Sequence, residues 1–202
     1  MTTRSLDSSE PRRPPWRLVP ATAADASGLT ALDRALARDG RGMVISEDQV
    51  RSEAAEAERL AALVTSSPKG SVCLLAKLDA DTVGAAELRV LSPRRCAHVG
   101  LLSIGVHPDF QGRGLGRALM VGLIDHARAH GLRRLELCVR ADNPRAIALY
   151  ESLGFVTEGV RRGFIALDDG GFADDLLMAR WLPDREQEEP SPERPRHREL
   201  TP

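Results

Sequence analysis

The stretch SIGVHPDFQGRGLGRALM, residues 103–120, runs from an apolar segment through a glycine-rich turn into a helical pattern. Its glycines, Gly112, Gly114 and Gly116, do not fit the dinucleotide fingerprint G-x-G-x-x-G, because Arg117 stands where the last glycine belongs. The G-K-S/T ending of a Walker loop is also absent. A strand that turns directly into a helix nevertheless presents backbone N–H groups at the positive end of the helix dipole. The stretch therefore predicts an anion-binding turn, with a turn needed only for close helix–strand packing as the alternative.

Gly105 interrupts the apolar run LLSIGV, residues 101–106. A glycine inside a strand often marks a bulge or a place where another backbone comes close. A bend there would splay the strand from the next parallel strand, LELCVRA at 135–141, and would leave N–H and C=O groups for an extended ligand. Arg113 and Arg117 add charge-assisted donors for an anionic group.

The hydrophobic period on either side of this stretch alternates between that of a strand and that of a helix. Strands are predicted at 16–19, 71–79, 82–91, 97–108, 132–141, 155–167 and 172–182, and helices at 21–40, 46–67, 112–131 and 143–154. Ser46 and Gln49 form the capping box expected at the start of the second helix. Asn143 and Gly154 are the expected cap and stop of the last helix. The order β-α-α-β-β-β-α-β-α-β-β predicts an α/β fold, a single domain with a mixed sheet and helices on both faces.

The 202 residues are 42% hydrophobic and 28% charged with a formal net charge of -1, so the chain has no basic field for nucleic acid or anionic lipid. No apolar run reaches membrane-spanning length. Cys73, Cys96 and Cys138 are odd in number and widely spaced, which favours a reduced, cytoplasmic protein. His126 and His130 have helical spacing but no third ligand nearby, so no metal is expected. Residues 1–15 and 183–202, rich in proline and charge, are predicted to be disordered tails.

The segments IGVHPDFQGRGLGRALM, residues 104–120, and NPRAIALYESLGF, residues 143–155, together resemble the GCN5-related N-acetyltransferase (GNAT) superfamily. The resemblance extends over residues 16–182, the expected N-acetyltransferase domain. It implies a mostly antiparallel sheet that is splayed between its central parallel strands. It also implies acetyl-CoA as the acyl donor, with its pyrophosphate bound by Gln111, Gly112, Arg113, Gly114, Leu115, Gly116 and Arg117.

Further site residues follow from the same resemblance. The backbone of Ile104, Gly105 and Val106 is expected to hold the pantetheine arm, with Asn143 nearby. Tyr150, the only tyrosine of the chain, is expected near the cofactor sulfur, where its phenol can donate a proton to the departing thiolate. The alternative for Tyr150 is an ordinary half-buried aromatic with a hydrated hydroxyl group.

The general base is marked less clearly. Relatives that acetylate protein N-termini carry a glutamate on the strand before this helix, but Cys138 stands at that position and is expected to be a packed small apolar residue. Glu136, two residues earlier on the same strand face, is expected to be solvated or salt-bridged. Glu87 is the preferred candidate, relaying a proton from the amine through water, and its alternative is also a solvated or salt-bridged carboxylate.

The ending FVTEGVRRGFIALDDGGFADDLLMARWL, residues 155–182, resembles that of bacterial members that acetylate free amino acids or other small amines. Its aspartates, Asp168, Asp169, Asp174 and Asp175, can attract a cationic amine, although aspartates in turns are more often solvated. The expected reaction is acetyl transfer to a primary amine of a small molecule or a protein N-terminus. The alternative is a catalytically weak CoA-binding sensor or interaction module of the same fold. The family also suggests a homodimer.

Overall fold

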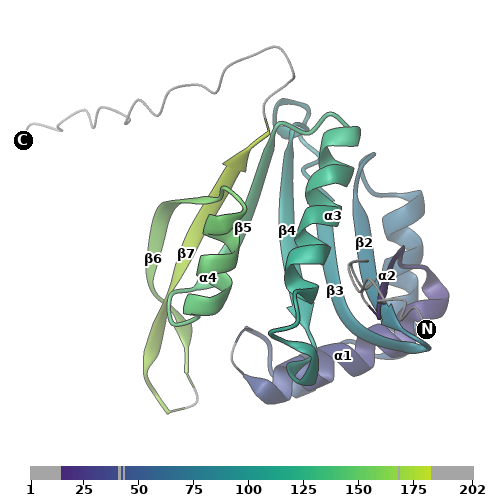
Figure 1. Ribbon diagram of the computed structural model, residues 1–202, viewed down its shortest axis with the longest axis horizontal. Helices are drawn as coiled ribbons and strands as arrows, with labels where there is room; N and C mark the ends of the chain where they lie inside the picture. Colours follow the sequence, from purple (N-terminus) through teal and green to yellow (C-terminus); the bar gives the residue numbers. More distant parts are fainter. Residues whose placement is uncertain (1–14, 41, 43, 168, 183–202) are drawn as a thin grey trace, which may run out of the picture. The chain divides into compact units, whose positions relative to one another are not determined.

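A computed structural model describes residues 15–40, 42, 44–167 and 169–182 (Figure 1). Within them, strands lie at Arg17–Pro20 (β1), Val72–Leu78 (β2), Asp81–Val90 (β3), Val99–Val106 (β4), Arg134–Arg140 (β5), Val156–Ala166 (β6) and Phe172–Trp181 (β7). The α-helices are Ala26–Asp39 (α1), Glu53–Thr65 (α2), Leu115–Ala129 (α3) and Pro144–Ser152 (α4), and short 3-10 helices lie at Ala23–Asp25 (η1), Glu47–Gln49 (η2), Arg94–Cys96 (η3) and Pro108–Phe110 (η4). The predicted order of strands and helices is confirmed. The tails predicted at 1–15 and 183–202 lie, apart from Pro15, outside the described residues.

Hydrogen bonds join the strands in the order β1-β2-β3-β4-β5-β7-β6. The pairs β1–β2, β2–β3, β5–β7 and β6–β7 are antiparallel, whereas β4 and β5 are parallel. The parallel ladder joins Val99–Leu101 to Arg134–Glu136, and both strands continue beyond it. A parallel ladder this short fits the predicted splayed, mostly antiparallel mixed sheet.

The described residues group into two compact units. The first unit holds the residues up to Ser67 together with Ser71–Leu88 and Ser103–Ile124, and it includes the glycine-rich turn. The second unit holds Pro68–Gly70, Arg89–Leu102 and the residues from Asp125 onward, and it includes α4, β5, β6 and β7. The candidate site residues are thus divided between the two units.

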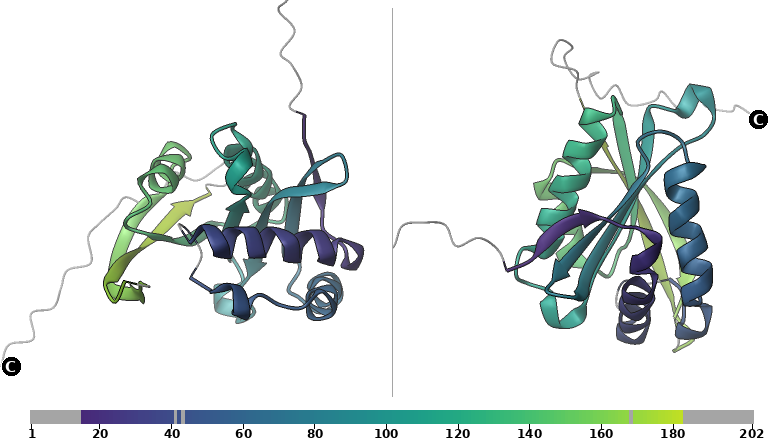
Figure 2. Two further views of the ribbon diagram at one scale, coloured as in Figure 1. Left: turned by 90° about the horizontal axis from the view of Figure 1, so that it is seen from below. Right: turned by 90° about the vertical axis from the view of Figure 1, so that its right-hand side faces the viewer.

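In the first unit, β2 and β3 lie between two layers of helices, α1 and α2 on one side and α3 on the other (Figure 2). Cys73 and Leu75 of β2 pack on the side of α1 and α2. On the opposite side, a Cβ built at Gly84 would lie 3.1 Å from side-chain atoms of both Leu115 and Leu119 in α3. Successive strand residues point to opposite faces. Burial of both faces explains why β2 is apolar without interruption over most of its length.

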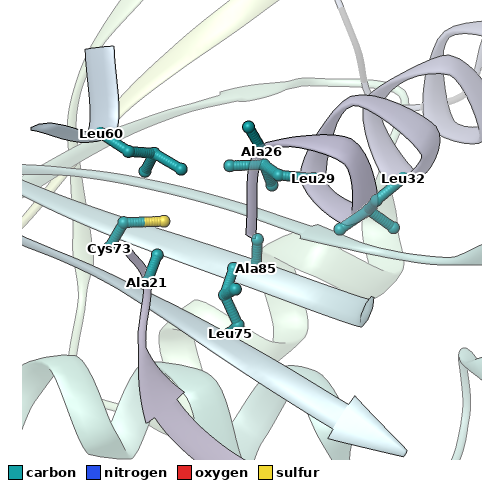
Figure 3. Packing of buried hydrophobic residues seen from close by; sticks show 8 residues of the cluster. All are labelled: Ala21, Ala26, Leu29, Leu32, Leu60, Cys73, Leu75 and Ala85. Carbon is teal, nitrogen blue, oxygen red and sulfur yellow. The ribbon is translucent and has the colours of Figure 1, made fainter. Parts of the chain in front are cut away.

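The core of the first unit on the α1–α2 side is made of small and branched side chains (Figure 3). It comprises Ala21, Ala26, Leu29, Leu32, Leu60, Cys73, Leu75 and Ala85. The alanines allow the helices to approach the strands closely, while the leucines fill the space between them. Among the described residues, no helix has both the length and the apolar character that a membrane crossing demands.

Helix α2 begins later than predicted. Ser46 and Gln49 do interact, since the Ser46 backbone N–H donates to Gln49 Oε1 at 3.0 Å, but they enclose only the short helix η2. Val50 then adopts an extended backbone, with φ -64° and ψ 132°. The helix starts after Ser52, whose hydroxyl oxygen accepts a hydrogen bond from Ala55 N at 3.3 Å. The prediction of one continuous helix over 46–67 is therefore wrong in its first part, because two serines in the segment can act as caps.

In the second unit, α4 lies alongside β6 and β7 (Figure 1). Asn143 Oδ1 accepts a hydrogen bond from Ala146 N at 3.1 Å and caps the helix, which starts at Pro144. After the helix ends, Gly154 adopts a φ of 81°. The predicted cap and stop are thus confirmed. Arg180 of β7 donates a hydrogen bond to the carbonyl of Leu153 and fixes this end of the helix to the sheet.

Candidate functional site

The glycine-rich turn lies in the first unit, where β4 ends and α3 begins. Two hydrogen bonds tie it to the strands. The His107 backbone N–H donates to the carbonyl oxygen of Val83 in β3 at 3.0 Å. The Gln111 side-chain amide donates to the carbonyl oxygen of Val106 at 3.1 Å. The glycines that follow therefore start from a fixed position.

Backbone conformation requires two of the three glycines. Gly112 and Gly114 have φ angles of 79° and 83°, in the left-handed region that residues with a side chain rarely adopt. A Cβ at Gly114 would meet nothing within 4 Å, so conformation rather than space calls for glycine there. Gly116 differs, because it lies within the first turn of α3. Leu115, only 1% exposed, anchors this helix end in the core.

Helix α3 opens directly from this turn, and a hydrogen bond from Ala118 N to the Gly114 carbonyl oxygen at 3.0 Å starts its ladder. The amides just before Ala118 therefore lie at the positive end of a 15-residue helix, where an anion is stabilised. Arg113 is exposed beside them, with its guanidinium carbon 5.3 Å from the centre of the Phe110 ring, and Arg117 is also exposed. The glycine-rich turn, the N-terminal end of α3 and the two arginines can together hold a phosphate group.

Gly105, near the end of β4, faces a side chain of α1 at close range. A Cβ built there would lie 2.4 Å from Leu36 Cδ1 of α1. The close approach expected at this glycine is therefore present: a side chain of α1 lies against it, and the Gly105 carbonyl oxygen would lie 3.4 Å from a Cβ built at Gly84 of β3. Ile104, Gly105 and Val106 are half-buried, and they follow the part of β4 that is paired with β5.

Asn143 and Tyr150 belong to the second unit, at the two ends of α4. The Asn143 side-chain oxygen is engaged in the helix cap, so its NH2 group is the part suited to a ligand contact. Tyr150 is 6% exposed, and its ring stands edge-on to that of Phe155 with 6.1 Å between centroids. Burial raises the pKa of Tyr150 to about 12, so the phenol keeps its proton throughout the physiological range. Tyr150 is thus more deeply buried than expected for its alternative role, that of an ordinary half-buried aromatic with a hydrated hydroxyl group.

Glu87 lies on β3 in the first unit, directly opposite Cys73 of β2. It is the salt-bridged carboxylate of the alternative, because Arg59 Nη1 donates to Glu87 Oε2 at 2.6 Å. The Glu87 side chain is still 23% exposed, so water can reach it. Burial raises the pKa of the neighbouring Cys73 thiol to about 12, which keeps this thiol neutral.

Sequence reasoning missed three charged residues around Glu87. Arg59 and Glu56 lie on α2, where the Glu56 side chain is only 1% exposed, and Asp33 lies on α1. Burial, followed by repulsion from Glu56, raises the pKa of Asp33 to about 6. One signal was available: Glu56 shares the helix face of Leu60 and Leu63, and a carboxylate in an apolar stripe needs a partner.

Glu136 and Cys138 of β5 lie in the second unit. Leu137 and Val139 are buried, whereas Cys138 is exposed. The expectation that Cys138 is a packed apolar residue is wrong, because strand alternation turns it away from the face that buries its two neighbours. Glu136 accepts a hydrogen bond from Arg134 Nε at 2.6 Å and is thus salt-bridged, as expected.

The aspartates near the end of the chain serve the β6–β7 hairpin. Asp168 lies outside the described residues. Asp169 and Asp174 each accept a backbone N–H of the hairpin, at 2.9 and 2.7 Å. Asp175 is 3% exposed and accepts a hydrogen bond from Arg161 Nε at 3.0 Å, so it is ion-paired and not solvated.

His126 and His130 stack on each other with 4.1 Å between ring centroids. Their rings lie 3.2 Å from the Gly70 carbonyl oxygen and 2.8 Å from the His126 carbonyl oxygen, respectively. Across the described part of the chain, no group of three or more His, Cys, Asp or Glu side chains is arranged to hold a metal ion.

Comparisons with known proteins agree with this geometry. The sequence model of the acetyltransferase (GNAT) family matches residues 37–155, more than half of the chain. The ribosomal protein bS18-alanine N-acetyltransferase of Escherichia coli is 49% identical over 79 residues, which make up 39% of this chain and 53% of that protein. The chain thus spans about half the length of the curated relatives it matches.

Solved structures extend the likeness to most of the chain. An acetyltransferase of the GNAT family from Streptococcus pneumoniae superposes with a TM-score of 0.77 at 27% identity, covering 83% of this chain and 99% of that one. A GNAT superfamily phosphinothricin acetyltransferase from Sinorhizobium meliloti, in complex with AcCoA, superposes with a TM-score of 0.74 at 25% identity, covering 88% and 94%. The chain belongs to the acetyltransferase (GNAT) family and has its single-domain α/β fold.

Proposed function

We propose that the chain is an acetyl-CoA-dependent N-acetyltransferase that acts on a primary amine, with residues 16–182 as its catalytic domain. The observation that carries this proposal is the turn of Gly112 and Gly114, whose left-handed backbone opens onto the positive end of α3 beside Arg113. Membership of the GNAT family supports acetyl-CoA as the ligand of the turn. The Sinorhizobium structure with AcCoA supports it as well.

Different parts of acetyl-CoA contact different groups of the cofactor-binding residues. The pyrophosphate lies against residues 111–117, where backbone N–H groups and the two arginines neutralise its charge. The pantetheine arm follows the backbone of Ile104, Gly105 and Val106, with the Asn143 side-chain NH2 group donating to one of its carbonyl groups. Because Gly112 and Gly114 carry no side chain, the pyrophosphate meets mainly backbone there.

Transfer begins when the lone pair of the neutral amine attacks the thioester carbonyl carbon. A C–N bond forms, the carbonyl oxygen gains negative charge, and the C–S bond breaks as the carbonyl re-forms. The nitrogen, which became positively charged on attack, then releases a proton to solvent and becomes the amide nitrogen. The leaving thiolate takes the phenolic proton of Tyr150, which then recovers a proton from solvent. The raised pKa of Tyr150 means that the phenol still holds its proton when the thiolate appears, although it also makes the phenol a weaker donor. Alignment of the reactants supplies much of the rate.

Glu87 is the candidate base for the proton that the amine loses. Its partial exposure supports a relay through water, in which the proton passes from the ammonium to a water molecule and on to the carboxylate. The relay leaves the amine neutral before attack.

The acceptor is an amine of a small molecule, such as an amino acid, or a protein N-terminus. One relative is named for the alanine of a ribosomal protein and another for phosphinothricin, which supports keeping both classes.

We place the enzyme in the cytoplasm and propose no metal, nucleic-acid or membrane partner. A homodimer is the proposed assembly. Its support is the edge strand β6, where the apolar residues Val156, Val160 and Phe164 are 61%, 51% and 56% exposed.

Release of free CoA thiol tests the proposal directly. The full chain is mixed with acetyl-CoA and, in separate reactions, amino acids, polyamines and short peptides with free N-termini. The expected result is amine-dependent thiol release with at least one class. Binding of CoA without turnover on any amine, with the same binding in Tyr150→Phe, would instead favour the sensor or interaction module. The absence of a glutamate at the position of Cys138 is the sequence feature that supports this alternative. Failure of CoA to raise the melting temperature would contradict both functions, because a ligand of the native state must stabilise it.

A further inference from the structure

A buried carboxylate fixes an arginine on α2 in the first unit. Glu56, with a side chain 1% exposed, accepts hydrogen bonds from Arg59 Nε at 2.9 and 3.0 Å and from Arg59 Nη2 at 2.6 Å. Arg51, whose side chain is 57% exposed, approaches Glu56 only to 3.7 Å. The planar guanidinium group of Arg59 is therefore oriented by Glu56 on one edge.

The other edge of the same guanidinium group reaches the sheet. Arg59 Nη1 donates to Glu87 Oε2 at 2.6 Å. Glu87 is paired across the strands with Cys73, which lies in the core facing α1 and α2, so the carboxylate is directed to the side of the sheet where Arg59 lies. Glu56, Arg59 and Glu87 form a chain in which each group limits the movement of the next.

An ion pair with so little exposure is a costly way to hold a helix on a sheet. Removing two charges from water takes free energy that the attraction between them often only just offsets, and well-packed apolar residues of similar size stabilise a fold equally well. The apolar neighbours of Glu56 on α2, Leu60 and Leu63, indicate that this face can be apolar. A role beyond stability is thus the better account of the arrangement.

We propose that Arg59 is a positioning residue for acetyl transfer, which orients the Glu87 carboxylate toward its water relay, and that Glu56 holds Arg59 for this purpose. The inference rests on the proposed function, because it assumes that Glu87 is the base. It adds two residues that act on the reaction only through Glu87, by fixing the direction of its carboxylate.

The charges around Glu87 come from every element packed there. Asp33 on α1, Glu56 on α2 and Glu87 on β3 are acidic, Arg59 on α2 and Arg51 before it are basic, and Cys73 on β2 is neutral. With two cations and three anions, the cluster has a net charge of 2 - 3 = -1 when every carboxyl is ionised. Loss of Arg59 makes it more negative, so the carboxylates take up protons more readily and at higher pH.

The pH dependence of kcat/KM tests the proposal, with the full chain, acetyl-CoA and an amine that gives turnover. For Arg59→Gln we expect kcat/KM to fall about 10- to 100-fold, as for loss of one hydrogen bond between charged groups. The pH below which activity is lost should move upward, because one cation is removed from the cluster. Arg59→Lys keeps the positive charge but not the planar set of N–H donors. The pH below which activity is lost should therefore stay near that of the unaltered chain, while kcat falls.

Two further variants separate positioning from folding. The double variant combines Glu56→Gln with Arg59→Gln, so that the buried Glu56 carboxylate is not left without its partner. In this variant the pH below which activity is lost should shift as it does in Arg59→Gln. Arg38→Gln is the matched control, because Arg38 forms an ion pair with Glu47 on the surface of the same unit, and its profile should not change. Melting temperatures of all variants report any loss of stability.

The decisive comparison is made in a Glu87→Gln background. If Arg59 acts through Glu87, adding Arg59→Gln should lower kcat/KM no further. Additive losses of kcat/KM overturn the inference and leave the proposed function standing. The same holds if the pH profile of kcat/KM is unmoved in both Arg59→Gln and the double variant while Glu87→Gln is impaired. Full activity of Glu87→Gln overturns the base assignment and the inference together. Absence of turnover by the unaltered chain on any amine overturns the proposed function itself.

Discussion

Asp33 makes the stability of the first unit depend on pH. Burial is the main cause that raises the pKa of Asp33 from 3.8 to about 6, repulsion from Glu56 adds to it, and Arg59 and Arg51 oppose it. In the folded state this carboxyl therefore loses its proton less readily than in the unfolded chain. Its ionisation destabilises the fold, with no effect below the unfolded pKa and the full effect above about 6.

The change Asp33→Asn keeps the size and removes the charge. A pKa difference of about 2 corresponds to roughly 3 kcal/mol, and partial exposure of this side chain reduces the expected effect to about 1–2 kcal/mol. Near pH 4 the variant and the unaltered chain should have similar free energies of unfolding, whereas at about pH 7.5 the variant should be more stable by that amount. Urea unfolding at a series of pH values measures the difference, provided that the m value stays constant.

Asp125→Asn serves as the control, because Asp125 is also on a helix but is 65% exposed and pairs with Arg128 on the surface. Its free energy of unfolding relative to the unaltered chain should vary little between the two pH values. A difference between Asp33→Asn and the unaltered chain that is constant with pH, or a variant that is less stable at about pH 7.5, would refute the reasoning.

Three further changes test the site. Tyr150→Phe keeps the packing against Phe155 but removes the proton, so kcat should fall about 100-fold in the thiol-release assay with no change in melting temperature. Gly105→Ala places a methyl group 2.4 Å from Leu36 Cδ1 and should lower the free energy of unfolding by about 1–3 kcal/mol in urea. Gly114→Ala meets open space but a φ of 83°, so it should cost about 1–2 kcal/mol and also weaken acetyl-CoA binding in calorimetry.

Each has an outcome that contradicts it. Unchanged kcat for Tyr150→Phe means that the thiolate takes its proton elsewhere. If Gly105→Ala is as stable as the unaltered chain, Leu36 moves aside without cost. For Gly114→Ala, the control is Gly131→Ala, which also meets open space at a φ of 74°. It should lose similar stability but no affinity for acetyl-CoA, and equal loss of affinity in both variants would argue against the turn as the binding site.

Local signals explain the parts of the fold that were predictable. The cap at Asn143 and the stop at Gly154 depend on a few neighbouring residues, and the left-handed backbone of Gly112 and Gly114 suits a residue type visible in the sequence. The start of α2 was not predictable in this way. Ser46 and Ser52 can both cap a helix, and the extended backbone of Val50, just after the short helix η2, separates the first cap from α2.

The charged residues around Glu87 show where sequence reasoning stops. Arg59 and Glu87 are 28 residues apart and on different elements, so their ion pair depends on how α2 lies on β3. The period of two in β5 places Cys138 on the polar face with Glu136, and its exposure was missed because a free cysteine was expected to be packed. Candidate residues can thus be named from the sequence, whereas their partners follow from packing.

Transfer of an isotopically labelled acetyl group from acetyl-CoA to an amine tests the central claim most directly. The full chain is incubated with labelled acetyl-CoA and the best acceptor from the thiol-release assay, and the position of the label is followed by NMR. We expect the label to appear as an amide on the acceptor nitrogen, with slower appearance for Tyr150→Phe. Label that stays on the thioester, or that appears only as free acetate, would contradict the account.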